Sequence, residues 1–183
     1  MKQSGGGWSD HPLTVAGIHQ AERLAKDIAD MKEKLAIRYI YSSDLCRTMQ
    51  TAQIIADRLR LPVKPLPQFR EVNNGDLAGM KNDIATVRYP GLFRNQMKWE
   101  QCYPGGESPS QFYERINAAW ADFSKEILSE NENVMLVTHG GVIHVIRTIL
   151  ENRLYSNSEK HRKVNHAEMI VLSYQNGAWK EII

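Results

Sequence analysis

The stretch VMLVTHGGVI, Val134 to Ile143, changes from apolar to polar and back to apolar within ten residues. Its first four residues form a short apolar run of the kind that fills a buried strand. Thr138-His139-Gly140-Gly141 interrupts the run, and a second apolar run of helical length follows. The pattern predicts a strand, a polar turn and a helix over residues 134–150. His139 and Gly140 would then lie where the strand ends, which is where open α/β sheets bind ligands.

The rest of the chain alternates helical and strand-like segments around this unit. Apolar residues at three- and four-residue spacing predict helices, and short apolar runs predict strands. Helices are expected at residues 14–34, 44–59, 82–88, 108–130 and 141–150, and strands at 38–41, 61–63 and 134–137. Residues 169–174 and 178–182 flank Asn176-Gly177, which is typical of a primed hairpin turn. The alternation predicts a three-layer α/β/α fold with a mainly parallel sheet, in a single domain over residues 1–183.

The composition is that of an ordinary globular protein. The 183 residues are 42% hydrophobic and 24% charged, with a formal net charge of +2. So small a charge, without a basic cluster, argues against nucleic acid as a partner, but a local pocket could still bind a small anion. Cys46 and Cys102 have no neighbouring ligand pattern, so neither a metal site nor a disulfide is expected. No apolar run reaches membrane-spanning length and the N-terminus has no signal-peptide core, which favours a cytoplasmic protein away from membranes.

Arg47 is a candidate anion ligand because it follows Ser42-Ser43-Asp44 and falls in the first turn of an expected helix. A helix N-terminus presents free N–H groups and the positive end of the helix dipole. A cation is unfavourable there unless an anion compensates, and a bound phosphate would do so. The local pattern alone favours the other interpretation, in which Arg47 is a surface residue paired with Asp44 or Asp57.

His139 and Glu71 are the candidate catalytic residues. A lone histidine is more often structural, but the exit of His139 from an apolar strand keeps the functional interpretation open. Glu71 lies in a loop rich in Pro, Asn and Gly. It would matter only if that loop folds over the same pocket, where Glu71 could donate a proton. The remaining histidines are interpreted as structural or surface residues: His11, His19, His144, His161 and His166.

Five motifs together resemble the histidine phosphatase superfamily, whose fold is phosphoglycerate-mutase-like. Each motif is weak alone, but all five occur in the order that is typical of the family and they span nearly the whole chain. They are Gly7-Trp8-Ser9-Asp10-His11-Pro12-Leu13-Thr14 with Gly17 and Gln20-Ala21, Ser42-Ser43-Asp44-Leu45-Cys46-Arg47-Thr48 with Gln50-Thr51-Ala52, Arg70-Glu71 with Gly75 and Gly79, Gly105-Gly106-Glu107-Ser108, and Thr138-His139-Gly140-Gly141.

The resemblance implies two-step phosphoryl transfer through a phosphohistidine, with a small phosphorylated metabolite as the partner. It implies that Arg47 binds the phosphoryl oxygens and that His139 stabilises the charge that develops during transfer. Glu71 would be the general acid that protonates the leaving oxygen. Backbone N–H groups near Gly7 and Gly140 would add phosphate contacts. No metal ion and no cofactor are implied, because cationic side chains take their place.

The sequence departs from the family at the attacking histidine. That residue should lie in an Arg-His-Gly motif at the end of the first strand, and no such motif occurs in the chain. His11 is a poor substitute, because it precedes Pro12 in a variable part of the pattern. We therefore expect that an interior strand and its loop, about 15–25 residues, are missing and that the sequence is N-terminally truncated.

The sequence leaves three possible functions. A phosphomonoester hydrolase is favoured, because the segment between Glu71 and Gly105 is short and the chain stops soon after the last hairpin. The first alternative is a phosphoglycerate mutase, an isomerase that usually carries longer insertions and a tail. The second is a non-catalytic remnant that binds a phosphorylated ligand, which the absent nucleophile favours. Residues 72–103 are expected to contribute to specificity.

Overall fold

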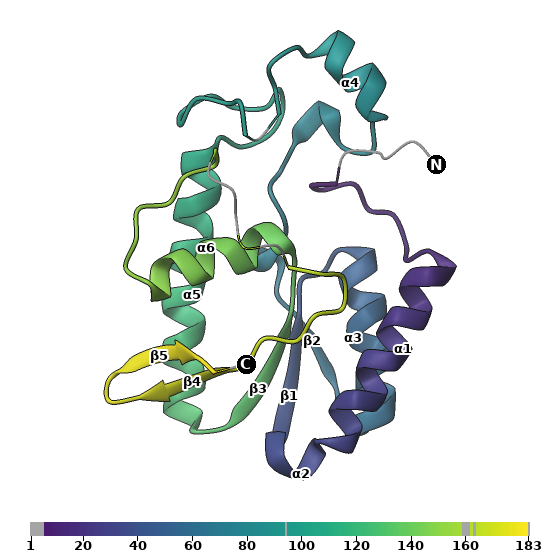
Figure 1. Ribbon diagram of the computed structural model, residues 1–183, viewed down its shortest axis with the longest axis vertical. Coiled ribbons are helices and arrows are strands. Elements are labelled where there is room, and N and C mark those ends of the chain that lie inside the picture. The colour runs from purple at the N-terminus through teal and green to yellow at the C-terminus, as the bar shows by residue number, and fades with distance from the viewer. Residues whose placement is uncertain (1–5, 94, 159–161, 163, 183) are drawn as a thin grey trace.

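Three parallel strands form the centre of the computed structural model, which describes residues 6–93, 95–158, 162 and 164–182 (Figure 1). The strands are β1 (Ile37–Ser42), β2 (Val63–Pro65) and β3 (Asn133–Val137), and their order in the sheet is β2-β1-β3. β1 pairs in parallel with both neighbours. The expectation of a mainly parallel sheet is therefore confirmed. Within the described residues, the edge of β3 that faces away from β1 pairs with no strand, and the further interior strand stays a prediction.

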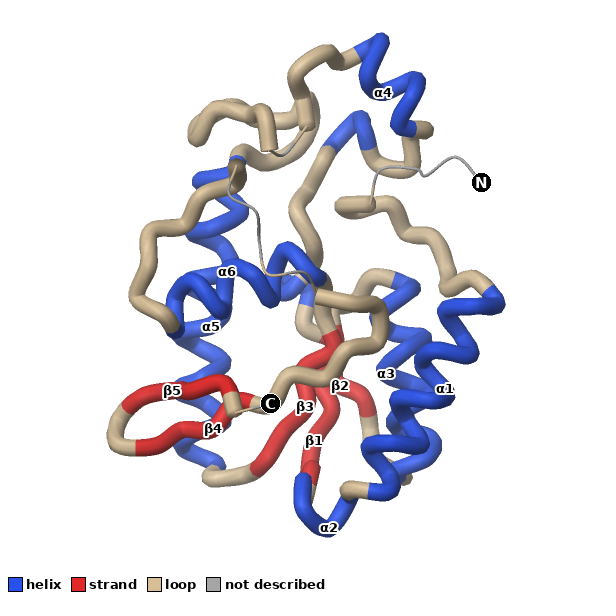
Figure 2. Tube along the Cα trace, viewed as in Figure 1, coloured by secondary structure: helices blue, strands red, loops and turns tan. Residues whose placement is uncertain are grey.

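Helices cover both faces of this sheet, as Figure 2 shows. Their bounds are α1 (Val15–Asp30), α2 (Lys32–Leu35), α3 (Cys46–Leu59), α4 (Asn82–Arg88), α5 (Pro109–Glu130) and α6 (Gly140–Leu150), with short 3-10 helices at Pro67–Phe69 and Gly75–Leu77. Successive side chains of β1 point to opposite faces. Ile40 packs into the apolar cluster of α1 and α3, whereas Tyr41 packs into the cluster of α5 and α6. The three-layer α/β/α prediction is confirmed.

Two helices begin at polar residues that cap them. The Thr14 hydroxyl accepts a hydrogen bond from the Gly17 N–H at 3.1 Å, which satisfies one unpaired donor of α1. Ser108 and Gln111 form a reciprocal capping box at the start of α5. The cap of α3 is not local, because the Cys46 N–H donates to the Asp10 carboxylate.

Two expected helix boundaries and the expected burial of β3 are wrong. The helix expected at residues 14–34 breaks at Met31, whose N–H bonds to carbonyls of the last turn of α1 before α2 begins. The helix expected from Asp44 begins at Cys46, because Leu45 keeps an extended backbone. The last four residues of β3 are only half-buried, because β3 lies at the edge of the described sheet.

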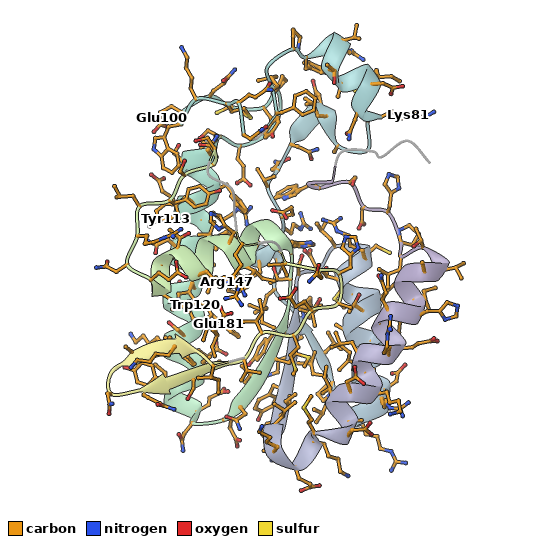
Figure 3. All side chains as sticks on the ribbon, viewed as in Figure 1. Lys81, Glu100, Tyr113, Trp120, Arg147 and Glu181 are labelled. Atoms are coloured by element: carbon orange, nitrogen blue, oxygen red, sulfur yellow. The ribbon has the colours of Figure 1, made fainter. Side chains whose placement is uncertain are left out.

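The C-terminal hairpin packs beside α6, outside the parallel sheet. It consists of β4 (Leu172–Gln175) and β5 (Ala178–Glu181), so its first strand begins later than expected. Asn176 and Gly177 both have positive φ, 53° and 80°, which confirms the primed turn. Arg147 of α6 donates to both carboxylate oxygens of Glu181, at 2.7 and 2.8 Å, and so fastens the hairpin to the helix (Figure 3).

Residues 72–93 and 95–103 form a cap above the sheet, at the top of Figure 1. Their own small apolar cluster contains Leu77, Ala85, Met97 and Tyr103. α4 contributes Ala85 to this small cluster. The assignment of the whole chain to one domain stays a prediction. Of the helices that the structure describes, none has the length and apolarity needed to cross a membrane.

Candidate functional site

The carboxyl ends of β1 and β3 lie next to each other, as the parallel pairing requires. Ser42 is opposite Val137 in the register, and the Ser43 N–H donates to the Val137 carbonyl at 2.9 Å. The turn that leads into α3 therefore touches the turn that leads into α6. Arg47 follows the first of these connections, in the first turn of α3, and His139 belongs to the second.

His139 lies at the N-cap of α6 with its imidazole between two partners. Its Nδ1 is 3.2 Å from Nη2 of Arg47, and its Nε2 is 2.8 Å from Oγ of Ser43. A guanidinium only donates hydrogen bonds, so Nδ1 must be the acceptor. We therefore assign the proton to Nε2, which donates to the Ser43 hydroxyl. The residue is 7% exposed.

The surroundings of His139 keep its ring neutral. Burial is the main cause that lowers its pKa to about 4, and the positive charges of Arg47 and Arg115 act in the same direction. The carboxylates of Glu71 and Asp44 oppose this change without reversing it. At pH 7 the imidazole is thus neutral, and its Nδ1 lone pair accepts the hydrogen bond from Arg47.

Arg47 points back into the fold from the first turn of α3. Its Nη1 donates to the Ser9 carbonyl at 2.7 Å and its Nη2 to the Gly7 carbonyl at 2.8 Å. Burial lowers the pKa of its guanidinium, and the charges of Glu71 and Asp10 oppose that effect. The interpretation of Arg47 as a surface residue paired with a nearby aspartate is wrong, because Asp44 binds Arg70 and Asp57 accepts from Gln53.

The carbonyl oxygen of Gly7 accepts a hydrogen bond from Arg47. Its φ is +60°, and a Cβ at this position would lie 2.0 Å from Oδ1 of Asn74, so the turn requires glycine. A phosphate contact from the N–H groups near Gly7 stays a prediction. Gly140 is the first residue of α6 and is exposed, with open space where a Cβ would stand. The start of α6 is thus accessible at the residue next to His139.

The loop that carries Glu71 does fold over the pocket. Oε2 of Glu71 accepts from the Gly141 N–H at 3.0 Å, and Oε1 accepts from the Val72 N–H at 3.0 Å. The carboxylate therefore caps α6 from a distant part of the chain, next to His139. Glu71 was expected to matter only if its loop folds over the pocket, and the structure shows that it does.

Arg115 of α5 holds the Glu71 loop in place. Its Nη2 donates to the Glu71 carbonyl at 3.2 Å, and its Nη1 donates to the carbonyls of Gln68 and Arg70 at 2.8 and 3.1 Å. Glu107 binds the same guanidinium through both oxygens, at 2.7 and 3.1 Å. Sequence reasoning missed Arg115, because its helical position gives no sign of its contacts with distant carbonyls.

A second arginine closes the other side of the loop. Arg70 donates to both oxygens of Asp44 at 2.6 Å, and this pair holds the pKa of the Asp44 carboxyl below its usual value. The Arg70 guanidinium lies 4.7 Å from the centre of the Trp8 ring. The Trp8 indole N–H donates to the Glu71 carbonyl at 2.6 Å. The first and third motifs of the sequence therefore meet at this pocket.

Two other histidines contact side chains other than Arg47. His19 is exposed and bonds to Glu22 at 3.1 Å, and His144 is buried with its ring 5.3 Å from that of Tyr155. Among the described residues, only His139 contributes an imidazole that is hydrogen-bonded to Arg47. His161 lies outside the described residues.

Comparison with known proteins agrees with the resemblance seen in the motifs. The model of the histidine phosphatase superfamily, branch 1, matches residues 2–182. The chain is 33% identical over 176 residues to a protein of Enterobacter sp. (strain 638) named probable phosphoglycerate mutase GpmB, covering 94% of this chain and 78% of that one. A protein of Proteus mirabilis with the same name is 31% identical over 183 residues, with the same coverage.

Solved structures share the fold at lower identity. YhfR of Bacillus stearothermophilus superposes with a TM-score of 0.83 at 23% identity, over 98% of this chain and 87% of that one. The alpha-ribazole phosphatase of Shigella flexneri gives 0.82 at 20% identity, with 98% and 87% covered. A mycobacterial glucosyl-3-phosphoglycerate phosphatase gives 0.75 at 23% identity, with 98% and 90% covered.

Proposed function

Because the chain belongs to branch 1 of the histidine phosphatase superfamily, we propose that its pocket binds the phosphoryl group of a small phosphate monoester for hydrolysis. The observation that carries the proposal is the 3.2 Å contact between Arg47 and His139, with Glu71 on the same helix N-terminus. Arg47 supplies a cation, His139 an imidazole and Glu71 a carboxylate, and all three lie around the start of α6. Such a set suits an anion that gains charge during reaction.

Each residue has a distinct task in this proposal. Arg47 turns from the carbonyls of Gly7 and Ser9 to the phosphoryl oxygens, for which its guanidinium has matching geometry. His139 takes up a proton beside the dianion and then donates a hydrogen bond to it. Glu71 protonates the leaving oxygen. The N–H groups at Gly140 add the positive end of the α6 dipole.

These 183 residues are not expected to complete the reaction alone, because the sequence lacks the motif of the attacking histidine. Covalent transfer needs an attacking histidine, and the sequence has no Arg-His-Gly motif. We therefore expect the chain to bind phosphate without turning over esters, with the nucleophile supplied by a preceding strand. An in-frame stop codon directly upstream of the Met1 codon would contradict the expectation of a preceding strand.

Phosphate binding and p-nitrophenyl phosphate turnover test the proposal together. Calorimetric titration of the chain with inorganic phosphate should show one site, and Arg47→Ala should weaken it by about 10- to 100-fold. Arg38→Ala, at an exposed arginine paired with Glu132, is the matched control and should bind as the parent does. Absence of phosphate binding would overturn the proposal, whereas ester turnover by the 183-residue chain would overturn the limit on the nucleophile.

A phosphoglycerate mutase is the second candidate, because the two named relatives above carry that name. Conversion of 3-phosphoglycerate to 2-phosphoglycerate, measured beside phosphate release in a form extended upstream to include the attacking histidine, separates the two activities. Loss of phosphate without isomerisation supports the hydrolase. The cytoplasmic location, the independence from metal ions and the absence of nucleic-acid and membrane partners stay predictions.

A further inference from the structure

We propose that residues 7–10, which form a strap beside the pocket, block the phosphate site by occupying the donors of Arg47, so that an anion binds only when the strap moves away. The inference rests on the proposed function of this pocket and adds a conformational control to it. The strap carbonyls and a phosphoryl group compete for the same N–H groups. The affinity for phosphate then depends on how firmly the strap is held.

The stereochemistry of Arg47 makes this competition unavoidable for an anion that binds through two oxygens. A guanidinium can hold two oxygens side by side across Nη1 and Nη2 or across Nε and Nη2. Nη2 belongs to both pairs and carries only two hydrogen atoms. It donates to the Gly7 carbonyl at 2.8 Å and to Nδ1 of His139 at 3.2 Å, while Nη1 donates to the Ser9 carbonyl at 2.7 Å. A phosphate across Nη1 and Nη2 therefore displaces both strap carbonyls.

The His139 side of Arg47 offers no equivalent opening. A phosphate across Nε and Nη2 would have to displace the imidazole, which is 7% exposed and whose Nε2 is 2.8 Å from Oγ of Ser43. Ser43 is itself fully buried. The strap, in contrast, belongs to no helix or strand, and its Trp8 is only partly buried. The strap is therefore the partner of Arg47 that gives way.

Trp8 holds the strap in its closed position through bonds that do not involve Arg47. Its backbone N–H donates to Oδ1 of Asn74 at 3.1 Å, and its indole N–H donates to the Glu71 carbonyl at 2.6 Å. The Arg70 guanidinium lies 4.7 Å from the centre of its ring. Trp8 lies between the two strap carbonyls in the chain, so withdrawal of both carbonyls moves Trp8 and breaks these bonds. They consequently oppose anion binding.

The two ends of the strap are held differently. The Asp10 carboxylate accepts a hydrogen bond from the Cys46 N–H, so this end is fixed to α3, the helix that carries Arg47. Gly6 precedes the strap at the other end and is exposed, with open space where a Cβ would stand. The strap can therefore turn about Asp10 while the part next to Gly6 moves outward.

Trp8→Phe tests the proposal by a gain of affinity, which general damage to the fold would not produce. Phenylalanine keeps an aromatic ring beside Arg70 but loses the indole N–H that binds the Glu71 carbonyl. Because the closed strap loses one hydrogen bond, calorimetry should show inorganic phosphate binding about 3- to 10-fold more tightly. Trp179→Phe is the matched control, because Trp179 packs on Trp120 in the hairpin region, and it should bind as the parent does. Unchanged or weaker binding in Trp8→Phe would overturn the proposal, since the strap would then position Arg47 without competing.

Amide hydrogen exchange at Trp8, followed by NMR, measures the strap directly. Exchange of an amide reports the local opening of its hydrogen bond, here the bond to Asn74. When phosphate saturates the parent, exchange at Trp8 should become about 3- to 10-fold faster. Without phosphate, Arg47→Ala should accelerate the same amide to a similar extent, and Arg38→Ala, at an exposed pair with Glu132, should not.

Unchanged or slower exchange at Trp8 with phosphate bound would overturn the proposal on the parent protein alone, so a poorly folded variant does not protect it. Equal rates in the parent and Arg47→Ala would overturn it as well, because Arg47 would then not hold the strap. Failure of both the parent and Trp8→Phe to bind phosphate would instead count against the proposed function. The comparison of the parent with Arg47→Ala would still decide the contact between Arg47 and the strap.

Discussion

Oε2 of Glu71 accepts a hydrogen bond from the backbone N–H of Gly141 at 3.0 Å, although 70 residues of sequence separate the two. The carboxylate therefore occupies the same helix N-terminus that a bound phosphate would approach. Two anions at one helix end repel each other, and only one can take the Gly141 N–H. An anion that binds the Gly141 N–H should consequently displace the Glu71 carboxylate from the helix end.

His139 should make the native state less stable as the pH falls. Its pKa is about 4 in the folded protein, and its ordinary value is 6.5. Because the folded pKa is the lower one, the unfolded chain binds the proton first, and stability is lost progressively between pH 6.5 and about 4. The free energy of unfolding should decrease by about 3 kcal/mol from this residue over that range. Urea unfolding of the parent and His139→Gln at several pH values measures the difference, and parallel profiles would show that His139 is not buried and neutral.

Replacement of Arg115 should loosen the Glu71 loop. Arg115→Lys keeps the charge but loses the paired geometry toward Glu107 and the loop carbonyls. The free energy of unfolding should fall by about 2 kcal/mol. Arg38→Lys is the control, because its pair with Glu132 is exposed at 3.8 Å and should contribute less than about 0.5 kcal/mol. Similar losses of unfolding free energy for the two variants in chemical denaturation would be inconsistent with a role of Arg115 in holding the Glu71 loop.

Gly75→Ala should be strongly destabilising. The φ of Gly75 is +49°, and a Cβ would lie 1.9 Å from the Pro104 carbonyl oxygen, so the backbone of the cap would have to move. We expect a loss of about 3–5 kcal/mol. Gly91→Ala has a similar positive φ of +79° but nothing within 4 Å, and should cost only about 1–2 kcal/mol. Thermal unfolding of the two variants separates steric from purely conformational effects, and equal shifts would argue against the close contact.

The sequence predicted the features that depend on neighbouring residues. The cap at Thr14, the start of α5 after Ser108 and the turn at Asn176-Gly177 follow from local rules, and the structure confirms them. The break of the first helix at Met31 was missed, because apolar periodicity continues through it. The half-burial of β3 was missed because it depends on which strands lie beside it.

The site was predictable only in part, for the same reason. Motifs identified His139, Arg47 and Glu71, and the structure brings all three together. The roles of Arg115 and of Asp10 as a cap were not accessible, since Cys46 lies 36 residues from Asp10 and the loop carbonyls that Arg115 binds lie 44 to 47 residues from it. The local pattern even favoured an aspartate partner for Arg47, whereas two backbone carbonyls of a distant loop accept its hydrogen bonds.

The parallel pairing of β1 with β3 also determines when the pocket can form during folding. Ser43 and Arg47 are 96 and 92 residues from His139, so their contacts close a long loop of chain. Loop closure of this length costs conformational entropy before the contacts are made, which places it late in folding. An intermediate that holds only α1, α3 and β1 would have no binding pocket. Ligand binding therefore reports completed folding, and a ligand would stabilise the finished chain without stabilising such an intermediate.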